Sequence, residues 1–367
     1  MKIFVFGSSI TSSYWNGAAT YYRGIYRQLN ALGHEITFAE PDAYGRQQNR
    51  DAGNFSYVTS IVYKTEAQLR ELLHHACESD LVIKHSGVGV FDELLEEEVL
   101  GCRSRTAAVA FWDVDAPATL ARVENNPQDP FRRPVTEYDL VLTYGGGPPV
   151  VERYLRLGAA NCHAIYNALD PETHFPVEPD PALRCDLLFI GHRLPDREER
   201  VAEFFLRAAL LAPEFKFVLG GEGWGGKSLP QNVRWLGHVG TSDHNRLNCS
   251  ARMVLNINRE SMASVGFSPP TRVFEAAGAG ACVITDAWEG IEAFFQPSQE
   301  VLVAKDADDV VRYLRTVTAA EARGIGAAMR RRALREHTYQ LRALQFDSIV
   351  VARQPMHAGA VTAESNA

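Results

Sequence analysis

The chain has 367 residues, a formal net charge of −8 and a hydrophobic content of 46%. This length exceeds what one hydrophobic core usually holds and fits two domains of roughly 150 to 180 residues. The acidic balance argues against nonspecific nucleic-acid binding, which needs a basic surface to displace the counterions of the phosphates.

Short apolar segments alternate with helical patterns through the first half of the chain. The first segment, MKIFVFG, lacks the basic stretch and long apolar core of a signal peptide. Strands that are separated by helices predict a parallel sheet with right-handed crossovers. The expected strands cover residues 2–6, 35–39, 81–84, 107–111, 140–143 and 163–166.

The pattern restarts after residues 167–184, NALDPETHFPVEPDPALR, which are rich in proline and acidic residues, as linkers are. This restart predicts a second domain of the same kind. We therefore expect an α/β protein with Rossmann-like domains at residues 1–169 and 170–338. The further strands are expected at residues 187–190, 215–219, 233–236, 253–257, 282–285 and 301–303.

The C-terminal part is helical in composition over residues 319–351, with an expected break near His337 and Thr338. Residues 356–367 are small and polar, which predicts disorder. A basic cluster on the expected helix is most simply a solvated face, and a weak contact with an anionic membrane surface is the alternative. The cluster consists of Arg330, Arg331, Arg332 and Arg335.

The cysteines are scattered without C-x-x-C spacing, which is typical of buried thiols in a reducing compartment. No apolar run reaches the roughly 18 to 20 residues that a membrane span needs. We therefore expect a cytoplasmic protein. The six cysteines are Cys77, Cys102, Cys162, Cys185, Cys249 and Cys282.

Residues 266–280, GFSPPTRVFEAAGAG, read as a small-residue loop, a short helix and a glycine stop before a buried strand. Amides ahead of a helix start, together with the helix dipole and a guanidinium, form an anion site that fits a diphosphate. The expected contacts are Gly266, Phe267, Ser268, Thr271 and Arg272.

Glu275 lies about one helical turn beyond Thr271, so a ligand with its phosphates at the helix start can offer its ribose hydroxyls to this carboxylate. The alternative interpretation is an amphipathic helix that packs on a sheet and ends at Gly280. The loop, the arginine and the carboxylate together favour the nucleotide site.

The motif resembles the nucleotide-sugar signature of GT-B glycosyltransferases, which have two facing Rossmann-like domains, and in particular family 4 and the CgeB-like spore-maturation glycosyltransferases. Family 4 has two glutamates separated by seven residues. Glu275, Ala276 and Gly280 match the second glutamate and its surroundings, whereas Phe267 stands at the first.

The CgeB-like pattern, G-[FY]-S-P-x-x-R-x-F-E-A-A-x-x-G, fits better. Its preceding N-x-x-R-x-x-M matches Asn256, Arg259 and Met262. The similarity extends over nearly the whole chain. The linker also resembles the hinge of GT-B enzymes, here with the spacing N-x-x-D-P-x-x-x-F. Asn167, Asp170, Pro171 and Phe175 carry this hinge. The resemblance implies a donor site on the second domain that includes Arg259, and a last helix, residues 339–355, that crosses back onto the first domain.

Other donor contacts follow from the same resemblance. Family 4 has a basic G-R-x-x-x-x-K-G motif where this chain has Gly191 and Arg193 but no lysine, so Arg197 or Arg272 is expected to supply the second charge. The base of the nucleotide is expected to pair with main-chain groups of the second domain. Gly17 of the first domain is expected to lie across the cleft from the phosphates. The base-binding loop is Gly237, His238 and Val239, with His238 either stacking on the base or lying on the surface.

His85 and Asp113 end two strands of the first domain and are the candidates for a general base in an inverting reaction. A retaining reaction would let the departing diphosphate accept the proton, and the likeness to family 4 favours retention. Asp113 and Asp115 have the spacing of a metal pair, but Asp115 followed by Pro117 is more typical of a helix cap. We expect no metal and no cofactor, with Arg193, Arg197 and Arg272 stabilising the diphosphate.

The sequence thus predicts a metal-independent glycosyltransferase that uses a nucleotide sugar, with a UDP-sugar favoured. The acceptor, a glycan, a small molecule or a protein, is expected among aromatic side chains in residues 14–22 and 44–57. The alternatives are a nonhydrolysing sugar-nucleotide epimerase, which shares the architecture, and a noncatalytic scaffold that binds sugar nucleotide or glycan. The sequence does not predict the oligomeric state.

Overall fold

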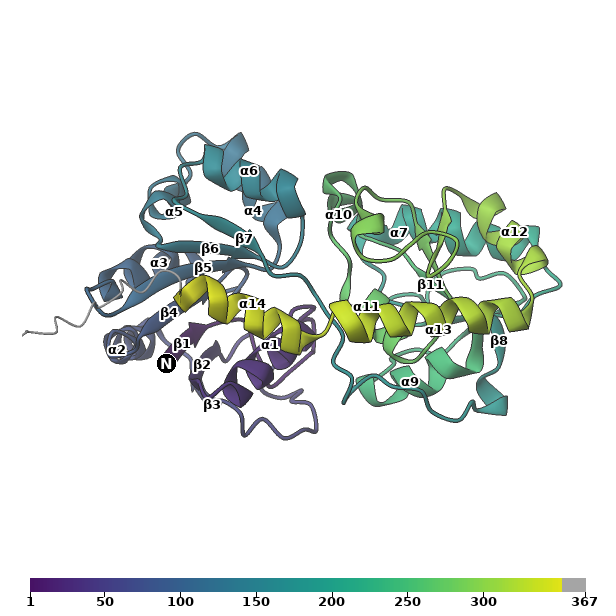
Figure 1. Cartoon of the computed structure of the whole chain (residues 1–367), viewed down its shortest axis with the longest axis horizontal. Coiled ribbons are helices and arrows are strands. Elements are labelled where there is room, and N and C mark those ends of the chain that lie inside the picture. Colours follow the sequence, from purple (N-terminus) through teal and green to yellow (C-terminus); the bar gives the residue numbers. More distant parts are fainter. Residues whose placement is uncertain (352–367) are drawn as a thin grey trace, which may run out of the picture.

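A computed structural model describes residues 1–351 and shows two α/β domains side by side (Figure 1). The strands of the first domain are β1 (Lys2–Phe6), β2 (Glu35–Pro41), β3 (Thr59–Tyr63), β4 (Leu81–His85), β5 (Ala108–Asp113), β6 (Leu140–Thr143) and β7 (Cys162–Ala164). Its helices are α1 (Ala19–Ala31), α2 (Glu66–Ala76), α3 (Asp92–Glu98), α4 (Ala116–Asn125), α5 (Pro134–Glu137) and α6 (Gly147–Arg156).

The second domain begins after the linker. Its strands are β8 (Cys185–Ile190), β9 (Phe217–Gly220), β10 (Val233–Trp235), β11 (Ala251–Asn256), β12 (Val283–Asp286) and β13 (Leu302–Ala304). Its helices are α7 (Pro195–Val201), α8 (Ala208–Leu211), α9 (Thr241–Ser250), α10 (Glu260–Val265), α11 (Thr271–Gly278), α12 (Ala307–Thr316) and α13 (Ala319–Glu336). The last helix, α14 (Tyr339–Val351), follows a short break.

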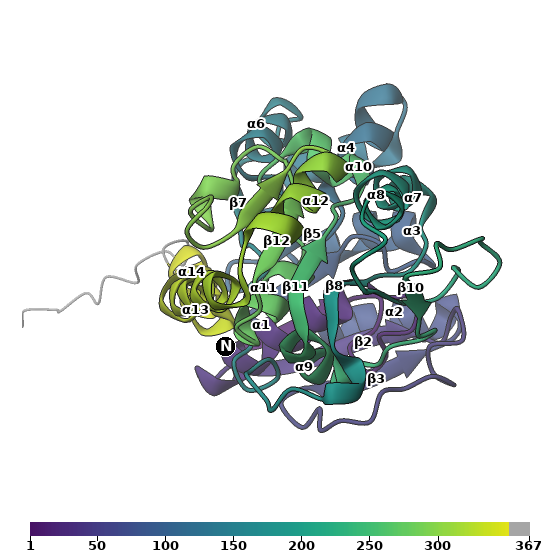
Figure 2. The ribbon, with the colours of Figure 1, turned by 90° about the vertical axis from the view of Figure 1, so that its right-hand side faces the viewer.

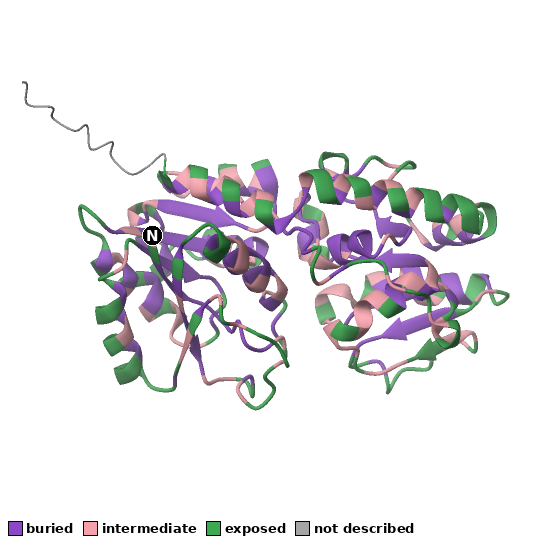
Figure 3. Cartoon of the chain, turned by 60° about the horizontal axis from the view of Figure 1, so that its bottom comes forward, coloured by how far each residue is buried: buried purple, intermediate pink, exposed green. Residues whose placement is uncertain are grey.

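Both sheets are parallel. The first has seven strands in the order β3-β2-β1-β4-β5-β6-β7, and the second has six in the order β10-β9-β8-β11-β12-β13. Alternate residues of β1 enter two different cores, Phe4 and Phe6 on one face and Ile3 and Val5 on the other. The central strands are therefore buried on both faces, as parallel sheets covered by helices require, and Figure 3 shows these strands in the colour of buried residues.

The C-terminal helices join the two domains. The backbone of Leu169 accepts from the N–H of Tyr339 at 3.0 Å and donates to His337 at 2.7 Å, at the break between α13 and α14. The two helices follow one another along the molecule in Figure 1 and are seen nearly end-on in Figure 2. Helix α14 packs on α1, where a Cβ on Gly24 would lie 2.3 Å from the Tyr339 ring. The expected crossing is confirmed for residues 339–351, whereas 352–355 and the expected tail 356–367 lie outside the described residues.

Two sequence expectations need correction. Strand β3 was not expected, and it lies at the edge of the first sheet with a largely exposed or half-buried pattern. Cys77 and Cys102 form a disulfide between the end of α2 and the short turn that follows α3, so the expectation of six free thiols is wrong for this pair. The other four cysteines are free, and three of them are buried.

The basic cluster on α13 is largely engaged within the protein. Arg330 donates to the carbonyl of Gly278, and both Arg332 and Arg335 pair with Glu336. Because these arginines are bonded within the protein, their charges are partly neutralised, which favours the solvated-face interpretation over binding of anionic lipid. Within residues 1–351, no helix combines the length and the apolar character that a membrane crossing requires.

Candidate functional site

The two domains meet where loops at the carboxyl ends of their strands face each other. The N–H of Gly146, in the loop after β6, donates to the carbonyl of Phe267 at 2.9 Å. Asn167 donates from its side chain to the carbonyl of Pro269 at 3.1 Å. In open α/β sheets the ligand site lies at this edge, so the loop that leads into α11 forms one wall of the interdomain seam.

A cavity of about 90 Å³ lies at this seam. Both domains contribute to its wall, and the second domain contributes two arginines and the Ser-Pro-Pro segment before α11. The lining residues are Tyr144, Gly145, Arg197, Ile257, Asn258, Arg259, Met262, Ser268, Pro269 and Pro270. Three residues of the sequence motif, Ser268, Pro269 and Pro270, therefore line an interdomain cavity, while the helix that follows packs in the core of the second domain.

Arg197 lines this cavity, and Arg272, which is not a lining residue, lies near enough to add a second positive charge. Burial lowers the pKa of Arg197 to about 9, and the charges of Arg272 and Arg259 add to the shift. Among residues 1–351, no hydrogen-bond partner meets Nε of Arg197 or the buried Nε and Nη1 of Arg272. Burial also lowers the pKa of Arg272, which only Glu275 offsets. Nearby carboxylates offset the pKa shifts only in part, and neither arginine forms an ion pair among residues 1–351. Buried cations without an ion-pair partner are unfavourable, so this pair is suited to an anion.

Glycine is needed beside Arg197. A Cβ at Gly191 would lie 2.8 Å from Nη2 of Arg197, and the same nitrogen donates to the carbonyl of His192 at 2.6 Å. Arg193 behaves differently, because its Nε pairs with Glu198 at 2.7 Å. The structure therefore groups Arg197 with Arg272 and pairs Arg193, in the loop before α7, with a residue of that helix.

Arg259 is also paired, although it lines the cavity. Its Nη1 lies 3.1 Å from Asp115 of the first domain, and its Nε lies 2.9 Å from Asp196. Asp115 occupies the N-cap position of α4, but its side chain makes no capping bond. The side chain instead joins the two domains, which the sequence interpretation of Asp115 as a helix cap missed.

Glu275 lies on α11 and is buried beside two histidines. Its Oε2 lies 3.3 Å from Nδ1 of His244, and its Oε1 lies 3.9 Å from Nε2 of His174. Burial alone would raise the pKa of Glu275, but His244, His174 and Arg272 hold it well below its usual range. Neither histidine was predicted, because one lies in the linker and the other on α9, with no shared spacing.

The loop before α11 has two strained positions. Gly266 has a φ of +76°, and a Cβ there would lie 2.8 Å from Glu289. Phe267 has a φ of +46°, and its ring lies against the positions of Gly147 and Gly290. Phe267 thus packs in the interdomain seam, whereas Ser268 is buried in the cavity wall and donates to the carbonyl of Gly266 at 2.9 Å. Thr271 begins α11 and is half-buried.

The expected base loop lies next to an interdomain aromatic stack. The His192 ring lies between Trp15 of the first domain, at 5.7 Å between centroids, and His238, at 6.4 Å. Gly237 has a φ of +72° and accepts from the N–H of Gly221. These contacts hold the loop of residues 237–239 in place in the structure.

Two of the expected donor contacts are less defined. Val239 packs against the position of Gly220, the last residue of β9. Gly17 is exposed, and a Cβ there would meet no atom within 4 Å. The space beside Gly17 is therefore empty, and no contact links Gly17 to Arg197 or Arg272 among the described residues.

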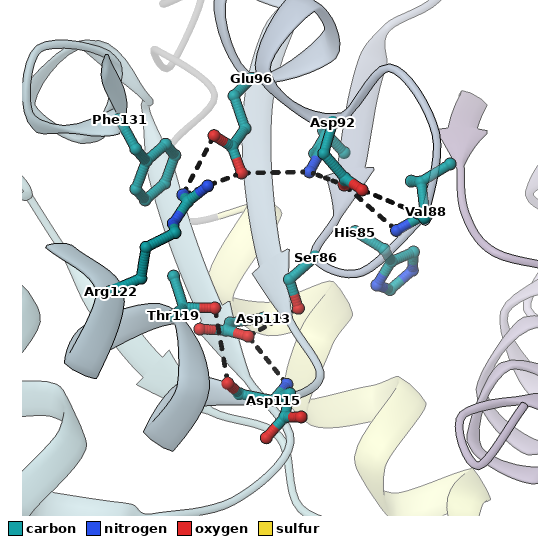
Figure 4. A network of polar contacts seen from close by, with 12 residues as sticks. His85, Ser86, Val88, Asp92, Glu96, Asp113, Asp115, Thr119, Arg122 and Phe131 are labelled. Atoms are coloured by element: carbon teal, nitrogen blue, oxygen red, sulfur yellow. Dashed lines mark hydrogen bonds and ion pairs between the residues drawn. The ribbon is translucent and has the colours of Figure 1, made fainter. Parts of the chain in front are cut away.

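His85 and Asp113, the expected candidates for a general base, both lie in buried surroundings. His85 is fully buried, its ring contacts Tyr26 and the carbonyl of Trp112, and burial lowers its pKa to about 3. Asp113 is also fully buried, and it accepts from the hydroxyl of Tyr154. It also accepts from Ser86 and from the N–H of Asp115, and these three residues are labelled in Figure 4. A base must contact the group that it deprotonates, and in this structure both side chains are bonded to neighbouring protein groups instead.

The comparisons agree with this geometry. Residues 197–348 match the family model described as "Glycosyl transferase-like". A sucrose-phosphate synthase from Thermosynechococcus elongatus superposes with a TM-score of 0.68 at 15% identity, over 96% of this chain and 99% of that chain. No curated protein sequence matches this chain.

Two other solved structures were determined with a nucleotide. HepE from Anabaena, in complex with UDP and glucose, has a TM-score of 0.68 at 11% identity and covers 96% of this chain and 100% of its own. An α-glucosyltransferase in complex with UDP and a DNA 13-mer has a TM-score of 0.66 at 11% identity, over 96% and 99%. The fold is therefore GT-B, and most of the second domain is similar in sequence to the glycosyl transferase-like family.

Proposed function

We propose that this protein is a glycosyltransferase that moves a sugar from a nucleotide sugar, with a UDP-sugar favoured, to an acceptor alcohol. The observation that carries the proposal is the unpaired Arg197 and Arg272 at the interdomain seam. Two proteins of the same fold were solved with UDP, which supports a diphosphate as the anion. The expected cytoplasmic location stays a prediction.

The chemistry follows from where charge develops. The bond between the anomeric carbon and the diphosphate oxygen breaks while the acceptor oxygen bonds to that carbon, and negative charge grows on the diphosphate. Two guanidinium groups and the start of α11 stabilise this charge without reorganisation, and in many enzymes such stabilisation accounts for most of the rate enhancement.

The fate of the acceptor proton favours retention. His85 and Asp113 are fully buried and bonded to other side chains, and Asp115 is engaged by Arg259. With these carboxylates and the imidazole occupied, the departing diphosphate is the group best placed to take the proton. This supports a retaining reaction, in which the diphosphate leaves on the face that the acceptor approaches.

The function is tested by incubating the protein with a panel of nucleotide sugars and measuring slow release of the nucleoside diphosphate. A glycosyltransferase should release free diphosphate from one donor class, with UDP-sugars leading. A product with altered sugar configuration and no free diphosphate would indicate the epimerase instead. Tight binding with neither product would indicate the scaffold, and inactive Arg272→Ala protein is the control for contaminating hydrolases.

We also expect this turnover to be independent of divalent metal. The arginine pair supplies the charge that a cation would otherwise supply, and the carboxylates of Asp113 and Asp115 are bonded within the protein. Turnover should therefore change by less than about twofold after EDTA treatment, within the scatter of ordinary surface effects. Loss of turnover with EDTA and recovery with Mg²⁺ or Mn²⁺ would contradict the proposal.

A further inference from the structure

The linker between the two domains contacts both α1 of the first domain and α11 of the donor site. It begins with a turn at Asp170, whose backbone carbonyl accepts from the N–H groups of Thr173 and His174 at 3.2 and 2.9 Å. The Asp170 carboxylate also accepts from the hydroxyl of Thr173 at 2.8 Å. Both the backbone and the side chain of Asp170 therefore determine the shape of residues 170–174.

Arg27, on α1, holds this carboxylate from the first domain. Its Nη1 lies 2.9 Å from Oδ2 of Asp170, and the exposed Glu172 lies farther away, at 3.6 Å. Only 9% of the Asp170 side chain is exposed, compared with 32% of the Arg27 side chain. Removal of one partner of a buried ion pair leaves an uncompensated charge, so we expect the linker turn to rearrange when Arg27 is replaced.

The same turn packs directly on α11. A Cβ on Gly278 of that helix would lie 2.6 Å from the carbonyl oxygen of His174, so the backbones of the linker and the helix touch. From α9, Asn245 donates to the carbonyl of Thr173 at 2.9 Å and accepts from the N–H of Phe175 at 3.3 Å. These contacts fix His174 between α9 and α11, and a rearranged turn must shift His174 relative to α11.

The His174 side chain lies between the carboxylate of the linker and the carboxylate of α11. It is 2% exposed, and its Nε2 lies 3.9 Å from Oε1 of Glu275. Burial lowers the pKa of His174, and the charge of His244 adds to this shift. The charges of Glu275 and Asp170 oppose it, so both carboxylates act on the ring. Within the described part of the chain, neither ring nitrogen has a hydrogen-bond partner, so the ring can bond to whichever carboxylate comes closer.

We propose that Arg27 is a positioning residue for the nucleotide donor, although it lies on the first domain. Its ion pair with Asp170 fixes the linker turn, and the turn keeps His174 beside Glu275. Without Arg27, the unpaired Asp170 attracts the imidazole and draws it away from the donor carboxylate. This inference rests on the proposed function and on the expected contact between Glu275 and the ribose.

The test measures binding of UDP and of its 2′,3′-dideoxy analogue to the full chain by calorimetry. The parent protein should prefer UDP. Arg27→Gln should weaken binding of UDP by about fivefold, within the range found for residues that couple two sites, and should leave binding of the analogue nearly unchanged. Arg27→Lys keeps the charge and should recover part of the loss. A merely structural role would weaken both ligands alike, so their ratio separates the two cases.

Arg23→Gln is the matched control. Arg23 lies one helical turn before Arg27 on α1, and both guanidinium groups lie over an aromatic ring of the first domain. Arg23 also forms an ion pair, at 2.6 Å, but its partner is Asp51, which lies outside the linker. Its replacement should therefore leave the preference for UDP as it is in the parent protein.

A double-mutant cycle tests the path itself. In Glu275→Gln protein, Arg27→Gln should have no further effect on UDP binding, because both changes act on one contact. An unchanged preference for UDP in folded Arg27→Gln protein would overturn the inference. Equal binding of UDP and the analogue to the parent protein would also overturn it, and this outcome needs no variant to fold. Failure of the parent protein to bind UDP at all would overturn the proposed function and this inference with it.

Discussion

Replacement of Arg272 by alanine should lower turnover by about two to three orders of magnitude, the loss typical of one preorganised electrostatic group. The guanidinium lies at the start of α11, and two of its buried nitrogens have no hydrogen-bond partner. Its interaction with the diphosphate should therefore be strongest in the transition state, when negative charge develops on the leaving group. Because the charge is buried without a full ion pair, its removal should leave thermal stability unchanged or slightly raised.

The measurement is kcat and KM for release of the nucleoside diphosphate, beside a thermal melt. Arg193→Ala is the matched control, since that arginine is paired with Glu198 and lies partly in solvent. Its loss should change kcat far less than the loss of Arg272. Near-normal turnover in Arg272→Ala together with a large loss in Arg193→Ala would move the leaving-group role to Arg193.

Most of the fold could be predicted because burial on both faces leaves a clear trace in the sequence. The central strands read as continuous apolar runs, and the break at His337 and Thr338 interrupts a long helical pattern at the place where α13 ends. Strand β3 was missed because an edge strand with exposed and half-buried positions has no such apolar run. The disulfide between Cys77 and Cys102 was missed because a separation of 25 residues has no local signature.

The site was predictable where its residues are close in sequence. Residues 266–280 place a loop, an arginine and a carboxylate on one helix start, and local geometry relates them. The general base was not predictable, because the end of a strand can be exposed or covered. Asp113 is covered by Tyr154 from α6, 41 residues later, and Asp115 meets Arg259 across 144 residues. Tertiary contacts over such distances have no pattern in one sequence.

Replacement of Glu275 should weaken binding of the nucleoside diphosphate by roughly ten- to one-hundredfold, as expected for a lost bond from a hydroxyl to a charged group. His244 and His174 hold this carboxylate ionised and fixed in position before a ligand arrives. Glu275→Gln keeps the shape and loses the charge, so it should bind more tightly than Glu275→Ala. The ribose of the donor is the expected partner.

Stability must be controlled in this experiment. Because the folded-state pKa of Glu275 is depressed, its contribution to stability is present above the unfolded-state value of about 4.3 and is lost as the pH falls below it. Both variants should therefore be less stable than the parent protein at neutral pH. Calorimetry is informative only at temperatures where thermal melts show each variant folded.

The decisive comparison uses UDP and its 2′,3′-dideoxy analogue. If Glu275 accepts from the ribose hydroxyls, the parent protein should prefer UDP, and Glu275→Gln should lose this preference, because the variant and the analogue remove the same contact. His244→Gln is the matched control, since it perturbs the buried pair but leaves the carboxylate. If Glu275 serves only to hold the two histidines, the preference for UDP will survive in Glu275→Gln. That result would show that Glu275 does not contact the ribose, and the proposed donor site would then depend on the arginine pair.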